Sequence, residues 1–197
     1  MAEDPYLYPE TNTLRNRFGL SDPAQLARVE ATITAGRLAE LEQRPIAGNY
    51  DLPHLQAFHR HIFGDVFDWA GEIRTVAIAR HDLFALPEHI ESYLGGVLAQ
   101  LPAEQHLRGL DREAFVDRLT YYLAEINASH PFREGNGRTQ RAFIGQLAQD
   151  AGYRIDWHRL DPQLNIDASR AAHRGDNQPL RAMLDGLIVT PEQDDIK

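Results

Sequence analysis

The chain has 197 residues, of which 43% are hydrophobic and 25% are charged. This composition is typical of a globular protein with a single core and excludes disordered and fibrous classes. The formal net charge is −9, which disfavours a protein that binds nucleic acid or anionic membranes through its overall charge. Cysteine is absent and the single lysine is Lys197, so disulfides, thiol nucleophiles, cysteine-ligated zinc and internal catalytic lysines are excluded.

The N-terminal sequence has neither the basic region nor the apolar region of a signal peptide. No stretch reaches the roughly 18 consecutive apolar residues of a membrane-spanning helix. We therefore expect a cytoplasmic protein with no membrane partner. A secreted effector is the alternative, because some export signals lack this pattern.

Apolar residues at helical spacing, bounded by cap residues and prolines, predict a mainly α-helical chain. No repeat or linker divides it, so we expect a single domain over residues 1–197, with a core at about 50–190 and an N-terminal extension at about 1–45. After an irregular lead-in, the seven predicted helices cover residues 22–41, 51–71, 87–101, 111–130, 138–151, 160–173 and 179–188, with Gly64 weakening the second helix before it closes at residues 69–71.

One segment has a good strand pattern. Thr75 to Ala79 is β-branched and alternating, His81 and Asp82 supply a turn, and Leu83 to Ala85 return. Because a single hairpin is not stable alone, it must lie on the helical body.

Residues 130–141, His-Pro-Phe-Arg-Glu-Gly-Asn-Gly-Arg-Thr-Gln-Arg, join two predicted amphipathic helices. Residues 135–137, Gly-Asn-Gly, tolerate unusual backbone angles, so successive N–H groups can face one concavity at a helix N-terminus and favour an anion there. Arg138 and Arg141 are three residues apart and share one face of that helix. Two guanidinium groups beside this concavity of N–H groups would suit a polyphosphate ligand.

Two further side chains in this segment fit phosphate chemistry. Glu134 offers a hard oxygen ligand of the kind that Mg²⁺ requires. His130 lies at a helix end and is a residue type suited to act as a general base, whereas Phe132 is expected in the core below the loop. Each residue alone also fits a structural role, but that explanation is weak for the whole group at this spacing.

A metal site at His54, His59 and His61 is the other candidate. His59 and His61 are two residues apart and therefore face different sides of a helix. No His-Glu-x-x-His pattern is present. We expect these histidines to be surface or partly buried residues.

The segment 130–141 matches His-x-Phe-x-(Asp/Glu)-Gly-Asn-Gly-Arg-x-x-Arg at every defined position, and the chain therefore resembles the Fic family. Residues 63–74 resemble the family's segment before its flap. Residues 104–110 and 151–157 resemble the class I Fic toxins that pair with small antitoxins. The resemblance implies the mainly α Fic fold, a helical bundle in which the hairpin at residues 75–85 is a flap.

The resemblance also implies an activity, that of a protein adenylyltransferase. Such enzymes use ATP and Mg²⁺ to transfer AMP to a protein hydroxyl. His130 would deprotonate the target hydroxyl, and Glu134 would coordinate Mg²⁺ that bridges the α- and β-phosphates. The target would dock on residues 75–85 by pairing its backbone with an edge strand.

The nucleotide-binding residues follow from the same resemblance. Gly135, Asn136 and Gly137 would form the anion-binding loop, Arg138 would stabilise phosphate charge, and Arg141 would hold the γ-phosphate. Doc-type kinases have lysine at the position of Gly137 and transfer the γ-phosphoryl group, so glycine favours AMP transfer here. The alternatives are another donor, such as one carrying UMP or phosphocholine, and a non-catalytic ATP-binding interaction protein.

The resemblance also bears on how the activity is inhibited. Many Fic proteins carry an inhibitory helix with the pattern Ser/Thr-x-x-x-Glu-Gly/Asn, and no glutamate of this chain has serine or threonine four residues before it. We therefore expect a separate small antitoxin whose glutamate reaches Arg141. Family analogy suggests type II topoisomerase subunits as targets, with no direct nucleic-acid partner.

Overall fold

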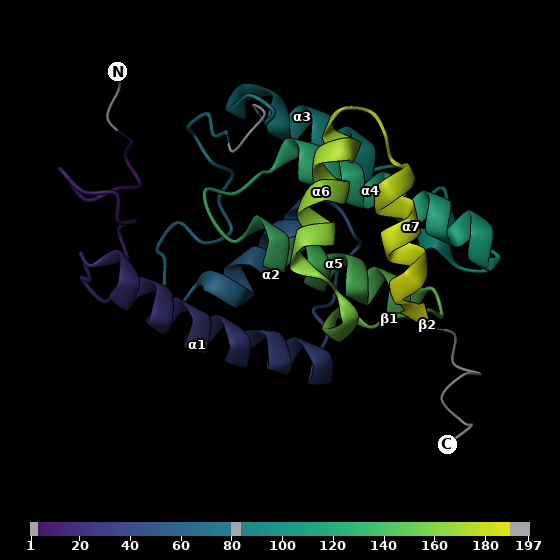
Figure 1. Cartoon of the computed structure of the whole chain (residues 1–197), viewed down its shortest axis with the longest axis horizontal. Coiled ribbons are helices and arrows are strands. Elements are labelled where there is room, and N and C mark those ends of the chain that lie inside the picture. Colours follow the sequence, from purple (N-terminus) through teal and green to yellow (C-terminus); the bar gives the residue numbers. More distant parts are fainter. Residues whose placement is uncertain (1–3, 80–83, 190–197) are drawn as a thin grey trace.

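The structure is a computed structural model that describes residues 4–79 and 84–189. Within these residues it is mainly helical, and the seven predicted helices are present (Figure 1), although the second ends at Phe63, next to Gly64, and not at residues 69–71. None of them is long and apolar enough to cross a membrane. Their bounds are α1 Pro23–Gln43, α2 Leu52–Phe63, α3 Pro87–Leu98, α4 Arg112–Ser129, α5 Asn136–Asp150, α6 Pro162–His173 and α7 Gln178–Leu187.

Aspartates start several of these helices, as the sequence predicts. The carboxylates of Asp22, Asp51 and Asp111 accept hydrogen bonds from backbone N–H groups in the first turns of α1, α2 and α4. Each bond satisfies a donor that has no partner within its helix. At its other end α4 stops at His130, which adopts the left-handed conformation before Pro131.

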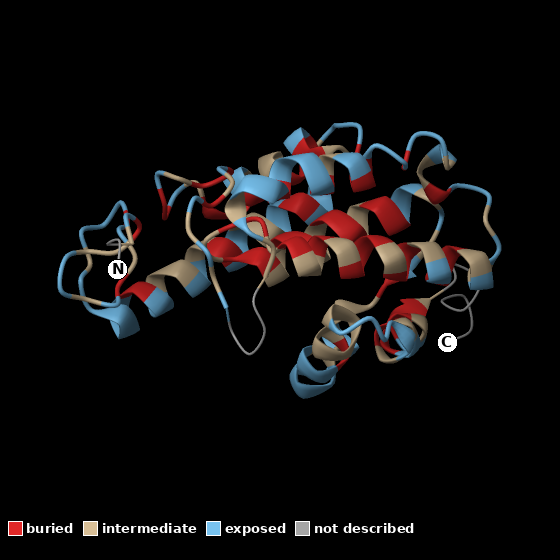
Figure 2. Ribbon diagram, turned by 90° about the horizontal axis from the view of Figure 1, so that it is seen from above, coloured by how far each residue is buried: buried red, intermediate tan, exposed pale blue. Residues whose placement is uncertain are grey.

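The core lies around α4, which packs against α3, α5, α6 and α7, while α2 packs against α1, α3 and α5. Buried residues run along these central helices, whereas α6 is mostly intermediate or exposed (Figure 2). The predicted inner faces of α4 and α5 are confirmed as buried: Phe115, Val116, Leu119, Leu123, Ile126, Phe143, Ile144 and Leu147.

The segment predicted as a hairpin has a less regular structure than its sequence pattern suggests. Residues 75–79 form a bend, irregular backbone and a single bridge residue at Ala79, and residues 84–86 are irregular. The N–H of Phe84 donates to the carbonyl of Ile78 at 3.3 Å, so the two arms do approach each other. The predicted turn at His81 and Asp82 lies outside the described residues.

The two-stranded sheet found among the described residues does not include the segment predicted as a hairpin. Strand β1, Arg154–Ile155, pairs antiparallel with β2, Ile188–Val189, and joins the segment after α5 to the end of α7. Strands of two residues are too short to show an alternating pattern, so the sequence gives no signal for them.

Candidate active site

The functional motif forms the turn between α4 and α5. Gly135 caps α5 with a φ of 78°, and the helix begins at Asn136, two residues earlier than predicted. The first N–H groups of a helix have no intrahelical acceptor, and no described side chain caps this end of α5. The Gly-Asn-Gly segment is therefore a left-handed cap followed by a helix N-terminus whose N–H groups can receive an anion.

The buried side chain of Asn136 stabilises this turn. It accepts a hydrogen bond from the N–H of Phe132 at 2.9 Å and donates to the carbonyl of the same residue at 2.7 Å. Phe132 is buried as predicted. The Asn136 amide thus fixes the loop, and the contribution of this residue to an anion site comes from its backbone.

His59 supports the motif from α2 and was missed as a site residue. Its ring stacks between Phe63 and Phe132, with centroid distances of 4.8 and 3.9 Å. Its Nδ1 accepts a hydrogen bond from the N–H of Gly71 at 2.7 Å, so Nε2 carries the proton and donates to the carbonyl of Glu134 at 3.0 Å. Burial lowers the pKa of His59 to about 4, which keeps the ring neutral.

Arg74 is a second supporting residue that the sequence did not reveal. Its side chain is 1% exposed, and its guanidinium donates only to backbone carbonyls among the described residues. The acceptors are His130 at 2.8 Å and Ser129 at 3.2 Å, at the end of α4, and Val76 at 2.7 Å and Ala85 at 2.6 Å, on the two arms of segment 75–85.

This arrangement explains the irregular arms. The carbonyls of Val76 and Ala85 accept hydrogen bonds from a side chain, so they are directed away from a regular strand ladder. Burial lowers the pKa of Arg74, although an arginine stays charged. One buried cation therefore joins the arms to the backbone of His130.

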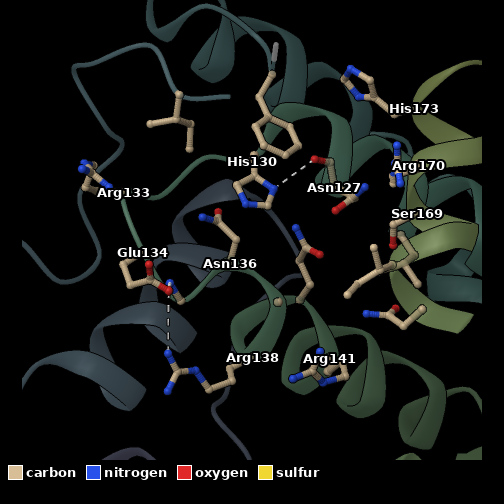
Figure 3. Close-up of a pocket in the computed structure, with 18 of the residues that line it drawn as sticks. Asn127, His130, Arg133, Glu134, Asn136, Arg138, Arg141, Ser169, Arg170 and His173 are labelled. Carbon is tan, nitrogen blue, oxygen red and sulfur yellow. Dashed lines mark hydrogen bonds and ion pairs between the residues drawn. The ribbon is translucent and has the colours of Figure 1, made fainter. Parts of the chain in front are cut away.

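His130 lies at the centre of the pocket wall (Figure 3). Its Nδ1 is 3.3 Å from the carbonyl of Asn127. A carbonyl only accepts, so this contact places the proton on Nδ1 and makes Nε2 the basic nitrogen of the neutral ring. The ring of Phe84 stacks on His130 at 3.9 Å, with 14° between the planes. The predicted base is therefore held in a defined orientation.

The two motif arginines have different surroundings. Arg138 forms ion pairs with Glu30 of α1 and, at 3.8 Å, with Glu134. Arg141 has no ion pair or hydrogen bond among the described residues, and burial, followed by the charge of Arg138, lowers its pKa. A desolvated cation without a carboxylate partner at a pocket wall indicates a place for an anionic ligand.

The pocket has a volume of about 710 Å³ and is lined by all seven predicted site residues: His130, Glu134, Gly135, Asn136, Gly137, Arg138 and Arg141. Helix α6 forms the opposite wall, with Ser169, Arg170 and His173 (Figure 3). Arg170 Nε and His173 Nδ1 are buried there and have no hydrogen-bond partner within the described residues. No sequence motif points to this wall.

The residues present fit a magnesium ion held mainly by a nucleotide. Among the described residues there is no group of three or more histidine, aspartate or glutamate side chains that would form a complete metal site. Glu134 lines the pocket with its side chain 36% exposed, and one of its oxygens accepts from the N–H of Gly135 at 2.9 Å. One carboxylate beside phosphate groups is the arrangement in which Mg²⁺ is usually bound.

Comparisons with known proteins agree with this geometry. The Fic/DOC family profile matches residues 49–148. The chain is 46% identical over 184 residues to protein adenylyltransferase VbhT of Bartonella schoenbuchensis, covering 93% of this chain but only 38% of that protein. It is 41% identical to the probable protein adenylyltransferase Fic of Salmonella typhimurium, covering 95% of this chain and 93% of the relative.

Solved structures show the same fold. The BepC protein of Bartonella tribocorum, crystallised with bound AMPPNP, superposes with a TM-score of 0.87 at 26% identity, covering 95% of this chain and 98% of that one. A Fic domain from Bartonella quintana with bound ADP gives a TM-score of 0.87 at 28% identity, covering 98% of each chain. The helical fold, the matched motif and the full-length relatives together show that the chain belongs to the Fic/DOC family.

Proposed function

We propose that this protein is an adenylyltransferase that transfers AMP from ATP to a hydroxyl side chain of a target protein. The observation that carries the proposal is the position of His130, with Nε2 as its basic nitrogen, in the same pocket as the N-terminus of α5 and Arg141, for which the described residues supply no carboxylate partner. Relatives that are similar over nearly their whole length bear the name of this activity. The matching structures hold AMPPNP and ADP.

The proposed reaction is an in-line displacement at the α-phosphorus. The target hydroxyl oxygen attacks that phosphorus, and its proton passes to Nε2 of His130. The new P–O bond forms as the bond from the α-phosphorus to the bridging oxygen of pyrophosphate breaks, and pyrophosphate leaves. Most of the catalytic effect then comes from positioning and charge stabilisation.

The charged parts of the site have separate tasks in this proposal. The N–H groups at the start of α5 and the guanidinium of Arg141 bind phosphate oxygens, with Arg141 at the γ-phosphate. Glu134 holds Mg²⁺, which supplies neutralisation of phosphate charge when bound. Gly137 stands where a lysine marks γ-phosphoryl transfer in related kinases, which supports AMP as the transferred group.

The partners belong to the proposal as well. The target docks on segment 75–85, of which Ala77, Ile78 and Phe84 line the pocket near His130. Type II topoisomerase subunits are the proposed targets, by family analogy. A small antitoxin would act by directing a glutamate to Arg141, and the lack of a carboxylate partner for Arg141 among the described residues supports that site.

Labelled nucleotides test the reaction. The protein is incubated with a bacterial lysate and ATP carrying label at either the α- or the γ-phosphate. We expect transfer to protein from α-labelled ATP only, and loss of that transfer in His130→Ala. Transfer only from γ-labelled ATP would replace AMP transfer by phosphorylation. Nucleotide binding without transfer from either would favour an interaction protein, and transfer from UTP or CDP-choline instead would change the donor.

A further inference from the structure

Arg138 is held by a helix that lies outside the matched family region. α1 contributes Glu30, whose carboxylate pairs with Nη2 of Arg138, and Thr34, whose Oγ1 accepts from Nη1 at 3.1 Å. Thr34 is 1% exposed, and its own hydroxyl proton is donated to the carbonyl of Glu30 at 2.8 Å. Its oxygen is therefore oriented to accept from Arg138.

The same guanidinium also faces Glu134. Nη2 of Arg138, the nitrogen that pairs with Glu30, is 3.8 Å from Oε1 of Glu134, which lies four residues earlier, just before α5 (Figure 3). The guanidinium carbon lies 4.7 Å from the centre of the Phe63 ring, a cation–π contact that further holds Arg138 beside the two carboxylates. Glu30 and Glu134 thus compete for one nitrogen, and Glu30 has the shorter contact.

We infer that Glu30 is a positioning residue that holds Arg138 on α1, keeps the guanidinium off Glu134 and so leaves the Glu134 carboxylate available to the cation that accompanies the nucleotide. This inference rests on the proposed function, because it assumes that nucleotide binds with Mg²⁺ at Glu134. Its physical basis is simple: a carboxylate fully paired with a guanidinium has fewer lone pairs and less net charge to offer a metal ion.

Loss of the Glu30 carboxylate should shift the pairing of Arg138 from Glu30 to Glu134. In Glu30→Gln the charged partner on α1 is lost, and Arg138 would move closer to Glu134, so that their 3.8 Å ion pair shortens to a direct hydrogen bond. Mg²⁺ must then displace Arg138 before it can bind Glu134. The variant should need more Mg²⁺ for nucleotide binding, while its nucleotide affinity at saturating Mg²⁺ should be close to that of the unchanged protein.

The test is titration calorimetry with AMPPNP at a series of Mg²⁺ concentrations. We expect Glu30→Gln to raise the half-saturating Mg²⁺ concentration roughly tenfold. The matched control is Glu42→Gln, which makes the same change at an exposed position of α1 that has no ion pair among the described residues. A crystal structure of Glu30→Gln without nucleotide should show Arg138 in direct contact with Glu134.

Several results would overturn the inference. One is a Mg²⁺ requirement in Glu30→Gln equal to that of Glu42→Gln. Another is tighter AMPPNP binding in Glu30→Gln, which would make Glu30 a competitor of the phosphates. If Glu30→Gln fails to fold, Thr34→Val, which loosens Arg138 from α1 with the charge kept, should raise the requirement in the same direction, and no change there would also refute it. If the unchanged protein binds no AMPPNP, the proposed function fails, and the Arg138 position in the crystal structure still decides the inference.

Discussion

Gly135 and Gly137 occupy equivalent places in the motif pattern but meet different constraints. A Cβ at Gly135 would lie 2.2 Å from the Phe63 ring, and its φ of 78° is left-handed. A Cβ at Gly137 would lie 3.4 Å from Nη1 of Arg141, an ordinary contact. The first glycine is therefore required by the fold, and the second borders the space where the ligand is proposed to bind.

Alanine substitutions should separate these roles. Gly135→Ala should lower the free energy of unfolding by about 2–4 kcal/mol, since it adds both a clash and backbone strain. Gly137→Ala should leave stability within about 1 kcal/mol, because alanine favours a helix, yet it should weaken AMPPNP binding. Urea denaturation and calorimetry measure the two quantities. Equal destabilisation by both substitutions would contradict this assignment.

His59 links stability to pH. In the unfolded chain it takes up a proton near its ordinary pKa of 6.5, whereas in the folded protein burial lowers that pKa to about 4. The unfolded state therefore binds more protons between these values, and the free energy of unfolding should fall by up to roughly 3 kcal/mol as the pH drops from 6.5 to 4. Above pH 6.5 His59 is mostly neutral in both states, and this loss of stability does not occur.

Calorimetric melting between pH 7 and pH 4.5 measures this effect. His59→Gln should be less stable at pH 7 but should lose less stability on acidification than the unchanged protein. His89→Gln, at an exposed position of α3, is the control and should follow the unchanged protein. An identical pH dependence in His59→Gln would show that another group causes the loss.

At the scale of elements, the end of α4 and segment 75–85 form one unit through Arg74. Its planar guanidinium presents donors in three directions, and all of its acceptors are carbonyls that point into the same buried space. The C-terminal carbonyls of α4 also favour a cation at this position. Arg74 thus helps to hold the base and the proposed docking segment relative to each other, together with the stacking of Phe84 on His130 and the hydrogen bond from the N–H of Ala85 to the carbonyl of Ala128.

Arg74→Lys tests this coupling with the charge kept. One ammonium cannot reach carbonyls on both arms and on α4 together, so His130 and Phe84 should lose their fixed relation. We expect AMP transfer to fall roughly a hundredfold, with AMPPNP affinity changed less than about threefold, since Arg74 does not line the pocket. Amide hydrogen exchange at Phe84 should become faster. Equal losses of binding and transfer would indicate a general structural defect.

Local signals explain which elements were predictable. Asp51 and Asp111 mark helix starts, and the seven predicted site residues within 130–141 all line one pocket. The start of α5 was placed too late because the left-handed cap at Gly135 has no pattern of its own. The irregular course of 75–79 follows from Arg74, a neighbour that the alternating pattern does not take into account.

Contacts between distant residues were beyond sequence reasoning. Arg74 meets His130 across 56 residues, His59 meets Glu134 across 75, and Glu30 meets Arg138 across 108. Each of these residues would fit a surface or a core equally well from composition alone. Their roles depend on how the helices pack, which periodicity does not specify.

For the whole molecule, the charge of the pocket differs from that of the surface. The formal net charge is −9, yet Arg141 and Arg170 line the pocket without a carboxylate partner among the described residues. The proposed ligand would supply the missing negative charge. Without it, the folded protein carries a desolvated cation that lowers its stability.

Arg141→Met should therefore have opposite effects on stability and binding. The nucleotide-free protein should become more stable by about 1 kcal/mol, because a half-buried charge without a carboxylate partner among the described residues is removed. Saturating AMPPNP with Mg²⁺ should stabilise the unchanged protein by about 3 kcal/mol at a hundredfold excess over its Kd and the variant far less. Thermal melting with and without AMPPNP measures both stabilities. The control is Arg28→Met, at an exposed position of α1. Lower stability in nucleotide-free Arg141→Met would contradict the argument.

The contacts of Arg74 have a consequence for how this protein can diverge. Within the described part of segment 75–85, Arg74 forms hydrogen bonds only with main-chain carbonyls, and every amino acid supplies such a carbonyl. Side chains of the segment other than Phe84, whose ring stacks on His130, can therefore change without altering these hydrogen bonds. Recognition of new targets can evolve in this segment while the geometry of the reaction stays the same.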